Sequence, residues 1–314
     1  MTDSENTIQY NQSHHRLALG LMLLTFILIF AGALVTSTGS SLSVPDWPLS
    51  YGTLFPSMKG GVLFEHSHRL LAGIVLIYSL ILAIYTQRIE KRQWVKRLVW
   101  ITFGAVILQA ILGGLTVLFL LPEALSVAHA GLAQIFVCLV ASIWVATSKE
   151  FINSNQHIVS KGRFFFPYAA VATVCIIYIQ ILLGALTRHS GAGLAIPDYP
   201  LSFGHLIPPY FDHAILVDFL HRTWAWAVLF SVLYLVAVIT YQYPEEKWLF
   251  RPAILSGFLV LLQMALGIMV VIGRKQIVPT SLHVVNGALV LVTVWVLSFR
   301  SFRIFKKSST TNDN

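Results

Sequence analysis

Charged residues are scarce in this chain of 314 residues, making up 11% of it, whereas soluble globular proteins have about 25%. Hydrophobic residues make up 56%. A composition of this kind excludes a set of soluble domains. Cysteine is also rare: the two that occur, Cys138 and Cys175, both fall inside apolar segments. Their placement argues against a disulfide framework and against a CxxC redox motif.

Long apolar runs, by contrast, are frequent in the sequence. They extend over about 20 residues, the length that an α-helix needs to cross a bilayer. The runs are continuous and do not alternate, so they do not fit the strands of a membrane β-barrel. The sequence therefore predicts an all-α polytopic membrane protein. We expect eight transmembrane helices at residues 17–37, 68–87, 98–120, 125–147, 164–187, 217–240, 253–272 and 280–299.

The formal net charge of +8 is interpreted as membrane topology, and no nucleic-acid partner is expected. Fifteen of the 21 basic residues fall in the N-terminus, alternate connections and the C-terminal tail. The positive-inside rule then predicts that both termini are cytoplasmic and that the segments near 38–67 and 188–216 lie outside. The N-terminus does not resemble an Arg-rich transit peptide, so a bacterial cytoplasmic membrane is favoured. The six basic residues on the outer side are Lys59, Arg69, Arg188, Arg222, Arg274 and Lys275.

An internal repeat organises the chain. The segment PDWPLSYG at 45–52 recurs as PDYPLSFG at 197–204, 152 residues later. The repeat predicts two tandem four-helix units, residues 1–147 and 164–314, joined by a cytoplasmic linker at 148–163. Each unit has an even number of spans, so the pseudo-twofold axis should run along the membrane normal. Gly32 also matches Gly184, and Gln109 and Gly113 match Gln263 and Gly267; these Gln and Gly pairs at mid-span are interpreted as helix packing, with a cofactor role as the alternative.

Four of the eleven histidines recur near the outer ends of the even-numbered spans: His68, His129, His221 and His283. Two histidines at a similar depth on different helices suit the two axial ligands of a haem iron held between four helices. We therefore expect one bis-histidine pair in each unit. For any single histidine, a hydrogen bond to a neighbouring helix is the alternative. Zinc is less favoured, because no cysteine or second acid completes a tetrahedral set.

Each unit also carries an acid three residues before a histidine and an arginine directly after it. The acids, Glu65 and Asp218, share the helical face of the histidine that follows. A carboxylate at a helix N-terminus explains Asp218, but it explains Glu65 less well, because an acid one turn from the iron also meets the geometric need for proton transfer at a porphyrin edge. Arg69 and Arg222 suit haem propionates, with snorkelling to the interface as the alternative.

The remaining histidines are assigned no role in binding. His14, His15 and His157 fall in polar segments and are expected to be solvated. Those of the second outer segment have no counterparts in the first and are interpreted as loop residues: His189, His205 and His213.

With these residues the chain resembles the haem A synthase family of membrane haem-modifying enzymes. The resemblance covers nearly the whole chain: the eight spans, the duplicated units, the four histidines and the E-x-x-H-R of residues 65–69. It implies an oxidoreductase that converts a methyl group of haem O, by successive hydroxylations, to the formyl group of haem A. A haem O synthase would supply the substrate, and haem-A-containing terminal oxidases or their assembly factors would receive the product. A homo-oligomer is a further option.

The resemblance also assigns roles to residues. It implies that His221 and His283 hold a resident haem b, that His68 and His129 frame the substrate haem, and that Glu65 is needed for catalysis. A haem with two histidine ligands suits electron transfer, so the haem b would pass electrons on. Many bacterial members carry a cysteine pair in the first outer segment. Residues 38–67 have no cysteine, so the chain is similar to the cysteine-free branch and no thiol-based step is expected.

Two other classes of protein use the same features. A diheme b-type electron-transfer protein, linked to quinol, would need the four histidines without any chemistry on haem. A duplicated transporter would also explain the repeat, but transport predicts ionisable residues or broken helices at the midplane. Here the ionisable residues gather at the outer ends, so transport is the least favoured reading.

Overall fold

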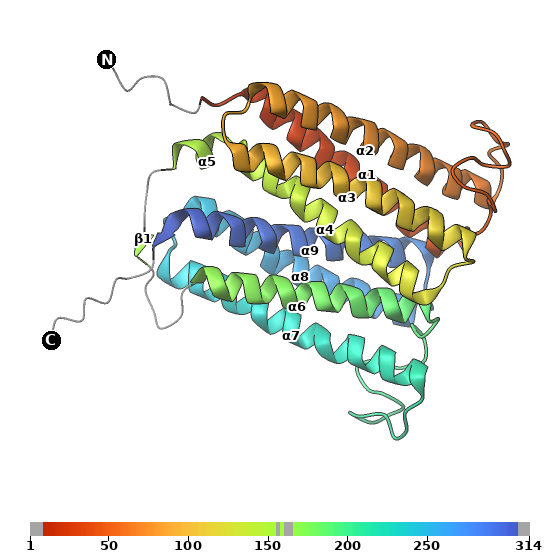
Figure 1. Cartoon of the computed structure of the whole chain (residues 1–314). Helices are drawn as coiled ribbons and strands as arrows, with labels where there is room; N and C mark the ends of the chain where they lie inside the picture. The colour runs from red at the N-terminus through yellow and green to blue at the C-terminus, as the bar shows by residue number, and fades with distance from the viewer. Residues whose placement is uncertain (1–8, 155–157, 160–165, 307–314) are drawn as a thin grey trace, which may run out of the picture.

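A computed structural model describes residues 9–154, 158–159 and 166–306. Within these ranges, eight long helices lie side by side (Figure 1). All eight are long and apolar enough to cross a membrane, which confirms the prediction of an all-α polytopic membrane protein. They are α1 Gln12–Ser37, α2 Gly61–Ile89, α3 Gln93–Leu118, α4 Glu123–Ala146, α6 Phe166–His189, α7 His213–Gln242, α8 Lys247–Ile272 and α9 Ile277–Ile304.

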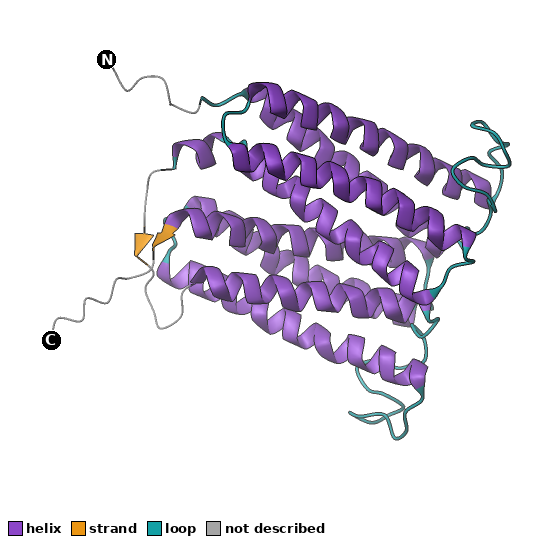
Figure 2. Cartoon of the chain, in the orientation of Figure 1, coloured by secondary structure: helices purple, strands orange, loops and turns teal. Residues whose placement is uncertain are grey.

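Two minor elements lie in or beside the predicted linker. The short helix α5, Lys149–Asn153, follows α4 directly. The two-residue strand β1, Ile158–Val159, pairs in parallel with β2, Phe305–Lys306, which follows α9 (Figure 2). The start of the linker is therefore helical, and its strand touches the C-terminal end of the last long helix.

Several helices begin earlier than the apolar runs indicated. Helix α2 begins at Gly61, seven residues before the predicted span, and α1 begins at Gln12 rather than at residue 17. The first turn of α1 is polar, and in α2 the polar residues 65–69 separate the first turn from the apolar run, so hydropathy alone did not reveal these helix starts. A span marks the part of a helix that suits hydrocarbon, and the hydrogen-bonded helix continues into the polar region.

The helix contacts are consistent with the two predicted four-helix units. In the first half, α2 and α4 each pack against both α1 and α3. In the second half, α7 and α9 each pack against both α6 and α8. The halves meet where α1 contacts α9 and where α4 contacts α6 and α9. Since lipid tails are as apolar as leucine, close packing rather than exclusion of water must hold these helices together.

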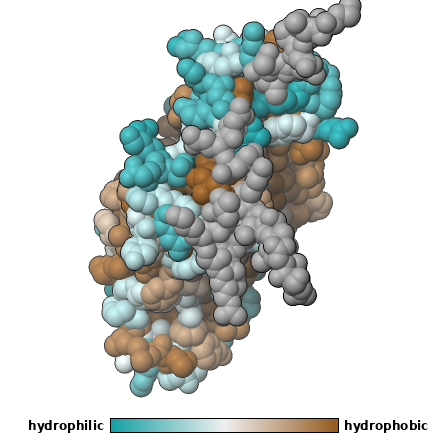
Figure 3. Space-filling view, turned by 90° about the vertical axis from the view of Figure 1, so that its left-hand side faces the viewer, coloured by the Kyte–Doolittle hydropathy of each residue, from teal (hydrophilic) through white to brown (hydrophobic). Residues whose placement is uncertain are grey.

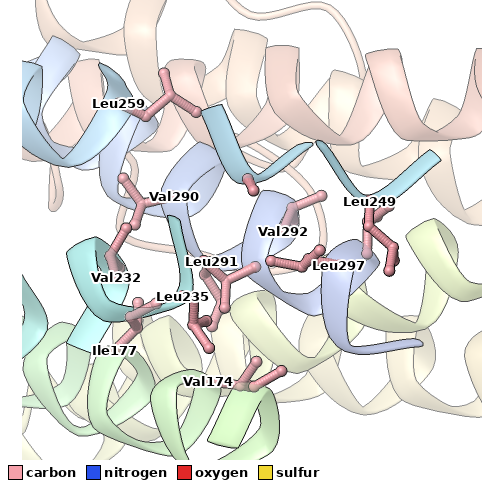
Figure 4. Packing of buried hydrophobic residues seen from close by; sticks show 14 of the residues in the cluster. Val174, Ile177, Val232, Leu235, Leu249, Leu259, Val290, Leu291, Val292 and Leu297 are labelled. Atoms are coloured by element: carbon pink, nitrogen blue, oxygen red, sulfur yellow. The ribbon is translucent and has the colours of Figure 1, made fainter. Parts of the chain in front are cut away.

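The largest buried cluster lies in the second half and reaches across to α4. Figure 4 shows how its side chains interdigitate: Val174 and Ile177 come from α6, Val232 and Leu235 from α7, and Leu291 from α9. Val137 and Val145 of α4 belong to the same cluster. Helix α4 therefore packs into this cluster from the first half, and it also contributes Phe136, Val140 and Ile143 to a second, separate cluster within the first half.

The two ends of the bundle differ in what they carry. The start of α1 and the end of α9 lie at one end of the bundle, the termini end, and two long loops, residues 38–60 and 190–212, project from the other, the loop end (Figures 1 and 2). Seen from the termini end, polar residues gather beside the hydrophobic flanks of the helices (Figure 3). Because α1 begins and α9 ends at the same end of the bundle, the helices cross it an even number of times.

One arginine links the halves at the loop end. Nη2 of Arg188, in the last turn of α6, donates hydrogen bonds to the carbonyl of Ala33, at 3.0 Å, and to Oγ of Ser37, at 2.8 Å. Both partners lie on α1. Ser281 of α9 donates to the same Ser37 hydroxyl at 3.0 Å. Helices α6 and α9 are thus tied to α1 by polar contacts that the sequence did not reveal.

Candidate functional site

The four repeated histidines lie at similar depth in the bundle. His68, His129, His221 and His283 belong to α2, α4, α7 and α9, the four helices that begin at the loop end. Each is within the first three turns of its helix. The four side chains are therefore presented near one end of the bundle, two from each half.

In the second half the two rings face each other across the bundle. The ring centroids of His221 and His283 are 6.5 Å apart, and their planes are inclined by 74°. Two metal–nitrogen bonds of about 2 Å, added to the distance from the nitrogen to the centroid in each ring, separate the two ring centroids by roughly 6 Å. The observed separation of the centroids is of the size that one metal ion between the two rings would need.

Each histidine ring packs against a glycine of the preceding helix. The glycines are Gly32 for His68, Gly113 for His129, Gly184 for His221 and Gly267 for His283. A Cβ atom added at these positions would lie only 3.0, 2.9, 2.9 and 3.2 Å, respectively, from Cε1 of the ring. Carbon atoms normally approach to about 3.5–4.0 Å, so any larger residue would displace the ring.

This contact corrects the interpretation of the matched glycines as helix packing alone. They do let neighbouring helices approach, but the group that each of them admits is an imidazole ring. The sequence contained the signal, because the glycines and the histidines repeat with nearly the same offsets, of 152 to 154 residues. What it could not supply was the pairing of a glycine on one helix with a histidine on the next.

The buried ring nitrogens are incompletely hydrogen-bonded. Nδ1 of His68, His129 and His283 is buried and has no hydrogen-bond partner. Buried polar atoms are nearly always paired, so orphaned ones need an explanation. Imidazole nitrogen is a good ligand for haem iron, and it would be satisfied by coordination. Half-buried imidazoles with orphaned buried nitrogens, which face each other in the second half, thus fit a haem.

Glu65 and Arg69 anchor the first outer loop. Oε2 of Glu65 accepts a hydrogen bond from the backbone N–H of Val44 at 2.9 Å, and Oε1 accepts one from Nη2 of Arg69 at 2.6 Å. The Arg69 guanidinium also donates to the carbonyls of Val44, Asp46 and Leu49, at 3.1, 2.6 and 2.9 Å. The carboxylate and the guanidinium therefore hold three loop residues by their backbone.

Asp218 and Arg222 make the same contacts in the second half. Oδ2 of Asp218 accepts from the N–H of Ile196 at 3.1 Å and from Nη2 of Arg222 at 3.0 Å. Arg222 donates to the carbonyls of Ile196 and Asp198, at 2.5 and 2.7 Å. In both halves the observed partners of the arginine are loop carbonyls and an acid. A contact with haem propionates stays a prediction for Arg69 and Arg222.

An aspartate folds the tip of each loop. The carboxylate of Asp46 accepts from the N–H groups of Gly52 and Tyr51, each at 2.7 Å. These hydrogen bonds hold the pKa of Asp46 below its ordinary value. Asp198 accepts from Gly204 and Phe203 in the same way, at 2.8 Å each, which lowers its pKa too. The repeated sequence thus encodes a repeated turn.

His66 differs from the residue at the matching position in the second half. Its Nδ1 lies 2.8 Å from Oγ of Ser50, and both side chains are buried. The matching position in the second half is Phe219, whose ring packs edge-on against Phe211. The first loop is therefore tied to α2 by one further hydrogen bond.

The expectation that His14 and His15 are solvated was wrong. His14 lies in the first turn of α1, is buried, and its Nε2 lies 2.8 Å from Oγ1 of Thr86. The ring of His15 stacks on Trp144 at 5.8 Å. Neighbouring helices cover these residues, which a polar local sequence does not reveal. His157 lies outside the described residues.

The other three histidines lie where the second outer loop meets its helices, or within it. His189 is the last residue of α6 and His213 the first of α7, so only His205 is a loop residue. His205 pairs by backbone hydrogen bonds with Ser202.

Known proteins with similar sequences match most of the chain. The chain is 32% identical over 268 residues to "Heme A synthase" of Shouchella clausii, covering 82% of this chain and 86% of the relative. It is 32% identical over 253 residues to the protein of that name in Bacillus pumilus, covering 77% and 80%. For Alkalihalophilus pseudofirmus the identity is 27% over 289 residues, covering 90% and 94%.

The family comparison covers all four histidines. Residues 57–295 match the COX15-CtaA family, which is described as cytochrome oxidase assembly protein. This span includes Glu65, the two arginines that hold the outer loops, Arg69 and Arg222, and the glycine partners of three histidines. The resemblance to haem A synthases is thereby confirmed. The chain belongs to the COX15-CtaA family of cytochrome oxidase assembly proteins.

Proposed function

We propose that this chain is a haem A synthase, a bacterial multi-pass membrane enzyme that oxidises a methyl group of haem O to the formyl group of haem A. The observation that carries the proposal is the pair of facing rings, His221 and His283, 6.5 Å apart in surroundings that recur around His68 and His129. The relatives that carry the name "Heme A synthase" cover most of the chain and support the same activity.

The two halves take different haems in this proposal. His221 and His283 hold a resident haem b, and His68 and His129 hold the substrate haem O. The haem b supplies one-electron chemistry when bound, and two histidine ligands favour electron transfer over binding of oxygen. Helix α4, which carries His129, packs against α6 and α9, which line the second pair. This contact supports an arrangement in which α4 separates the two proposed sites.

Glu65 is proposed as the catalytic acid–base. It lies one helical turn before His68, and its carboxylate is buried. A carboxylate there can accept a proton at the edge of the substrate haem, or stabilise positive charge that develops on the methyl carbon. The Val44 and Arg69 hydrogen bonds fix its orientation, as a catalytic group requires. Asp218 makes equivalent contacts, so the catalytic and structural roles of Glu65 must be separated by experiment.

We place the loop end on the outer side of a bacterial cytoplasmic membrane, with both termini cytoplasmic, because the basic residues gather at the termini end. The outer loops then cover the histidine pairs from outside. A haem O synthase and a haem-A-containing terminal oxidase, or its assembly factors, are the proposed partners. A hydrophobic, reactive product favours direct transfer between them.

The experiment that tests the activity is pigment extraction from cells that make haem O but not haem A, with and without this protein. We expect haem A, and a hydroxylated intermediate, only in cells that express the chain. A variant lacking both His68 and His129 is the matched control, since it should leave haem O unchanged while the protein inserts. Haem-loaded protein that leaves haem O unaltered would instead favour a diheme electron carrier.

A further inference from the structure

Two arginines near the end of α9, Arg300 and Arg303, are held against aromatic rings at the termini end of the bundle. Cζ of Arg300 lies 5.0 Å from the ring centroid of Trp248 and 5.9 Å from that of Trp144. Cζ of Arg303 lies 5.4 Å from the ring centroid of Phe151. A guanidinium is attracted to the face of an aromatic ring within about 6 Å, so these contacts fix the places of both positive charges.

The hydrogen-bond donors of these two guanidinium groups are almost unused. Nη1 of Arg300 donates to the carbonyl of Trp248 at 3.0 Å. Among the residues that the structure describes, Arg303 has no hydrogen-bond partner, and neither arginine forms an ion pair. Nε of each arginine is buried and unpaired. A guanidinium carries several N–H donors, and buried polar atoms are nearly always paired, so the described residues leave both groups short of an acceptor.

The neighbouring Arg92 shows how this chain satisfies a guanidinium at the same end of the bundle. Its Cζ lies 5.5 Å from the ring centroid of Trp94. Its Nε and Nη2 donate to the two carboxylate oxygens of Glu90, at 3.0 and 2.8 Å, and its Nη1 donates to the carbonyl of Ala146 at 2.9 Å. Arg92 therefore has a carboxylate and a carbonyl of its own, and the two arginines of α9 differ from it in lacking a carboxylate partner within the described part of the chain.

Neither the internal repeat nor membrane topology accounts for the two arginines. With the repeat offset of 154 residues, positions 300 and 303 match Ala146 and Lys149. The positive-inside rule requires only positive charge on this side, which exposed residues such as Arg88 and Arg251 supply. Half-buried guanidinium groups that are held by rings and lack acceptors are a different arrangement, and it indicates an anion-binding site.

The two arginines lie at the depth of phospholipid headgroups. The predicted apolar span of α9 ends at residue 299 and that of α8 begins at residue 253, so Arg300, Arg303 and Trp248 lie just outside the hydrocarbon. The exposed ring of Trp94 lies 6.1 Å from the ring of Phe151. Tryptophan is enriched at this level of a bilayer, where the phosphates of the lipids also lie.

We propose that Arg300 and Arg303 bind the phosphate of an anionic phospholipid, such as phosphatidylglycerol, in the leaflet at the termini end. Guanidinium groups bind phosphate oxygens through paired, charge-assisted hydrogen bonds, and basic pockets between transmembrane helices bind acidic headgroups. The aromatic rings fix the arginines, and the lipid supplies the missing acceptors. Trp144 belongs to the first half and Trp248 to the second, so a lipid bound here also stabilises the contact between the halves. This site is independent of the haem chemistry.

The test measures how far added phospholipid stabilises the purified, delipidated full-length protein. Phosphatidylglycerol in detergent micelles is titrated while thermal unfolding is followed, and phosphatidylcholine and inorganic phosphate are titrated in parallel. Arg303→Gln removes one guanidinium, and Arg300→Gln/Arg303→Gln removes both. The matched control is Arg88→Gln/Arg251→Gln, which removes two exposed arginines from the same end of the bundle.

We expect phosphatidylglycerol to raise the unfolding temperature of the unaltered protein and of the control variant at the same lipid concentration. Arg303→Gln should need about tenfold more lipid for half of the effect, the change expected when a hydrogen bond to a charged group is lost. Arg303→Lys, which keeps the charge but not the planar fork, should lie between the two. If the double variant fails to fold, the two Arg303 variants decide the test, because this side chain packs on a single ring.

Equal half-saturating lipid concentrations in Arg303→Gln and in the unaltered protein would overturn the proposal. The same loss of stabilisation in the Arg88→Gln/Arg251→Gln control would also overturn it, because total charge would then explain the effect. Equal stabilisation by phosphatidylcholine would refute selection of an acidic lipid, and equal stabilisation by inorganic phosphate would identify a soluble anion instead. The proposed haem chemistry stands or falls separately, by pigment extraction.

Discussion

The carboxylate of Glu65 accepts a hydrogen bond from the backbone N–H of Val44 at 2.9 Å, joining the second helix to a loop residue 21 positions earlier. Asp218 makes the same bond to Ile196. The acid of the E-x-x-H-R motif is therefore part of the scaffold in both halves. Any catalytic role of Glu65 is added to this structural one, and a variant must keep the acceptor while it removes the charge.

Replacing Glu65 by glutamine should separate the two roles. Glutamine retains a carbonyl oxygen for the Val44 N–H, so the loop should stay folded and both haems bound, while oxidation falls by about 10²- to 10⁴-fold, the usual contribution of an acid–base group. Asp218→Asn is the matched variant and should lose less than about tenfold. The measurement is the ratio of haem O, hydroxylated intermediate and haem A bound to each. Full conversion by Glu65→Gln would leave this acid with its structural role alone.

Removing either histidine of the facing pair should abolish the resident haem. His221→Ala and His283→Ala each delete one of the rings that lie 6.5 Å apart, so the low-spin b-type spectrum of the purified protein should be lost. His213→Ala is the control, because this exposed residue at the start of α7 should not affect the spectrum. A normal spectrum in both ring variants would contradict the assignment.

A methyl group added at Gly184 should displace the His221 ring. The new Cβ would lie 2.9 Å from Cε1, and overpacking of this kind costs about 1–3 kcal/mol. Haem affinity of the second half should therefore fall about ten- to a hundredfold, measured by titration of haem-depleted protein. Gly104→Ala is the control: nothing lies within 4 Å of its Cβ, so binding should not change. Equal affinities for the two variants would show that the ring can move aside.

The fold of the first outer loop should depend on pH through Asp46. Its pKa lies below the ordinary value because Gly52 and Tyr51 donate to the charged carboxylate. A lowered pKa in the folded loop means that the stabilisation is complete above the ordinary carboxyl pKa and is lost as pH falls through the lowered one. Hydrogen exchange at the Gly52 and Tyr51 amides, corrected for intrinsic rates, should show protection that fails only in acid. Asp46→Asn should weaken that protection at neutral pH, and unchanged protection would refute the link.

The sequence revealed the spans and the repeated histidines, because each rests on a local or periodic signal. An apolar run predicts a helix in lipid, and a repeat offset pairs His68 with His221 without any structure. The hydrogen-bond partners of Arg69 could not be predicted from the sequence, because three of them are backbone carbonyls, which every residue carries. The burial of His14 depends on Thr86 of another helix, so a polar local sequence gave the wrong answer.

The hydrogen bonds of Arg188 between the two halves have no counterpart at the matching position of the first half. The position that matches it in the first half, 152 residues earlier, is Thr36, whose hydroxyl only bonds the Gly32 carbonyl of its own helix. Two identical four-helix chains related by a twofold axis would have to form the Arg188 contact twice or not at all. Fusion of the units into one gene product removes that constraint, so each copy can diverge alone. Such freedom allows matched positions, such as Leu28 and Gln180, to carry different side chains in the two halves.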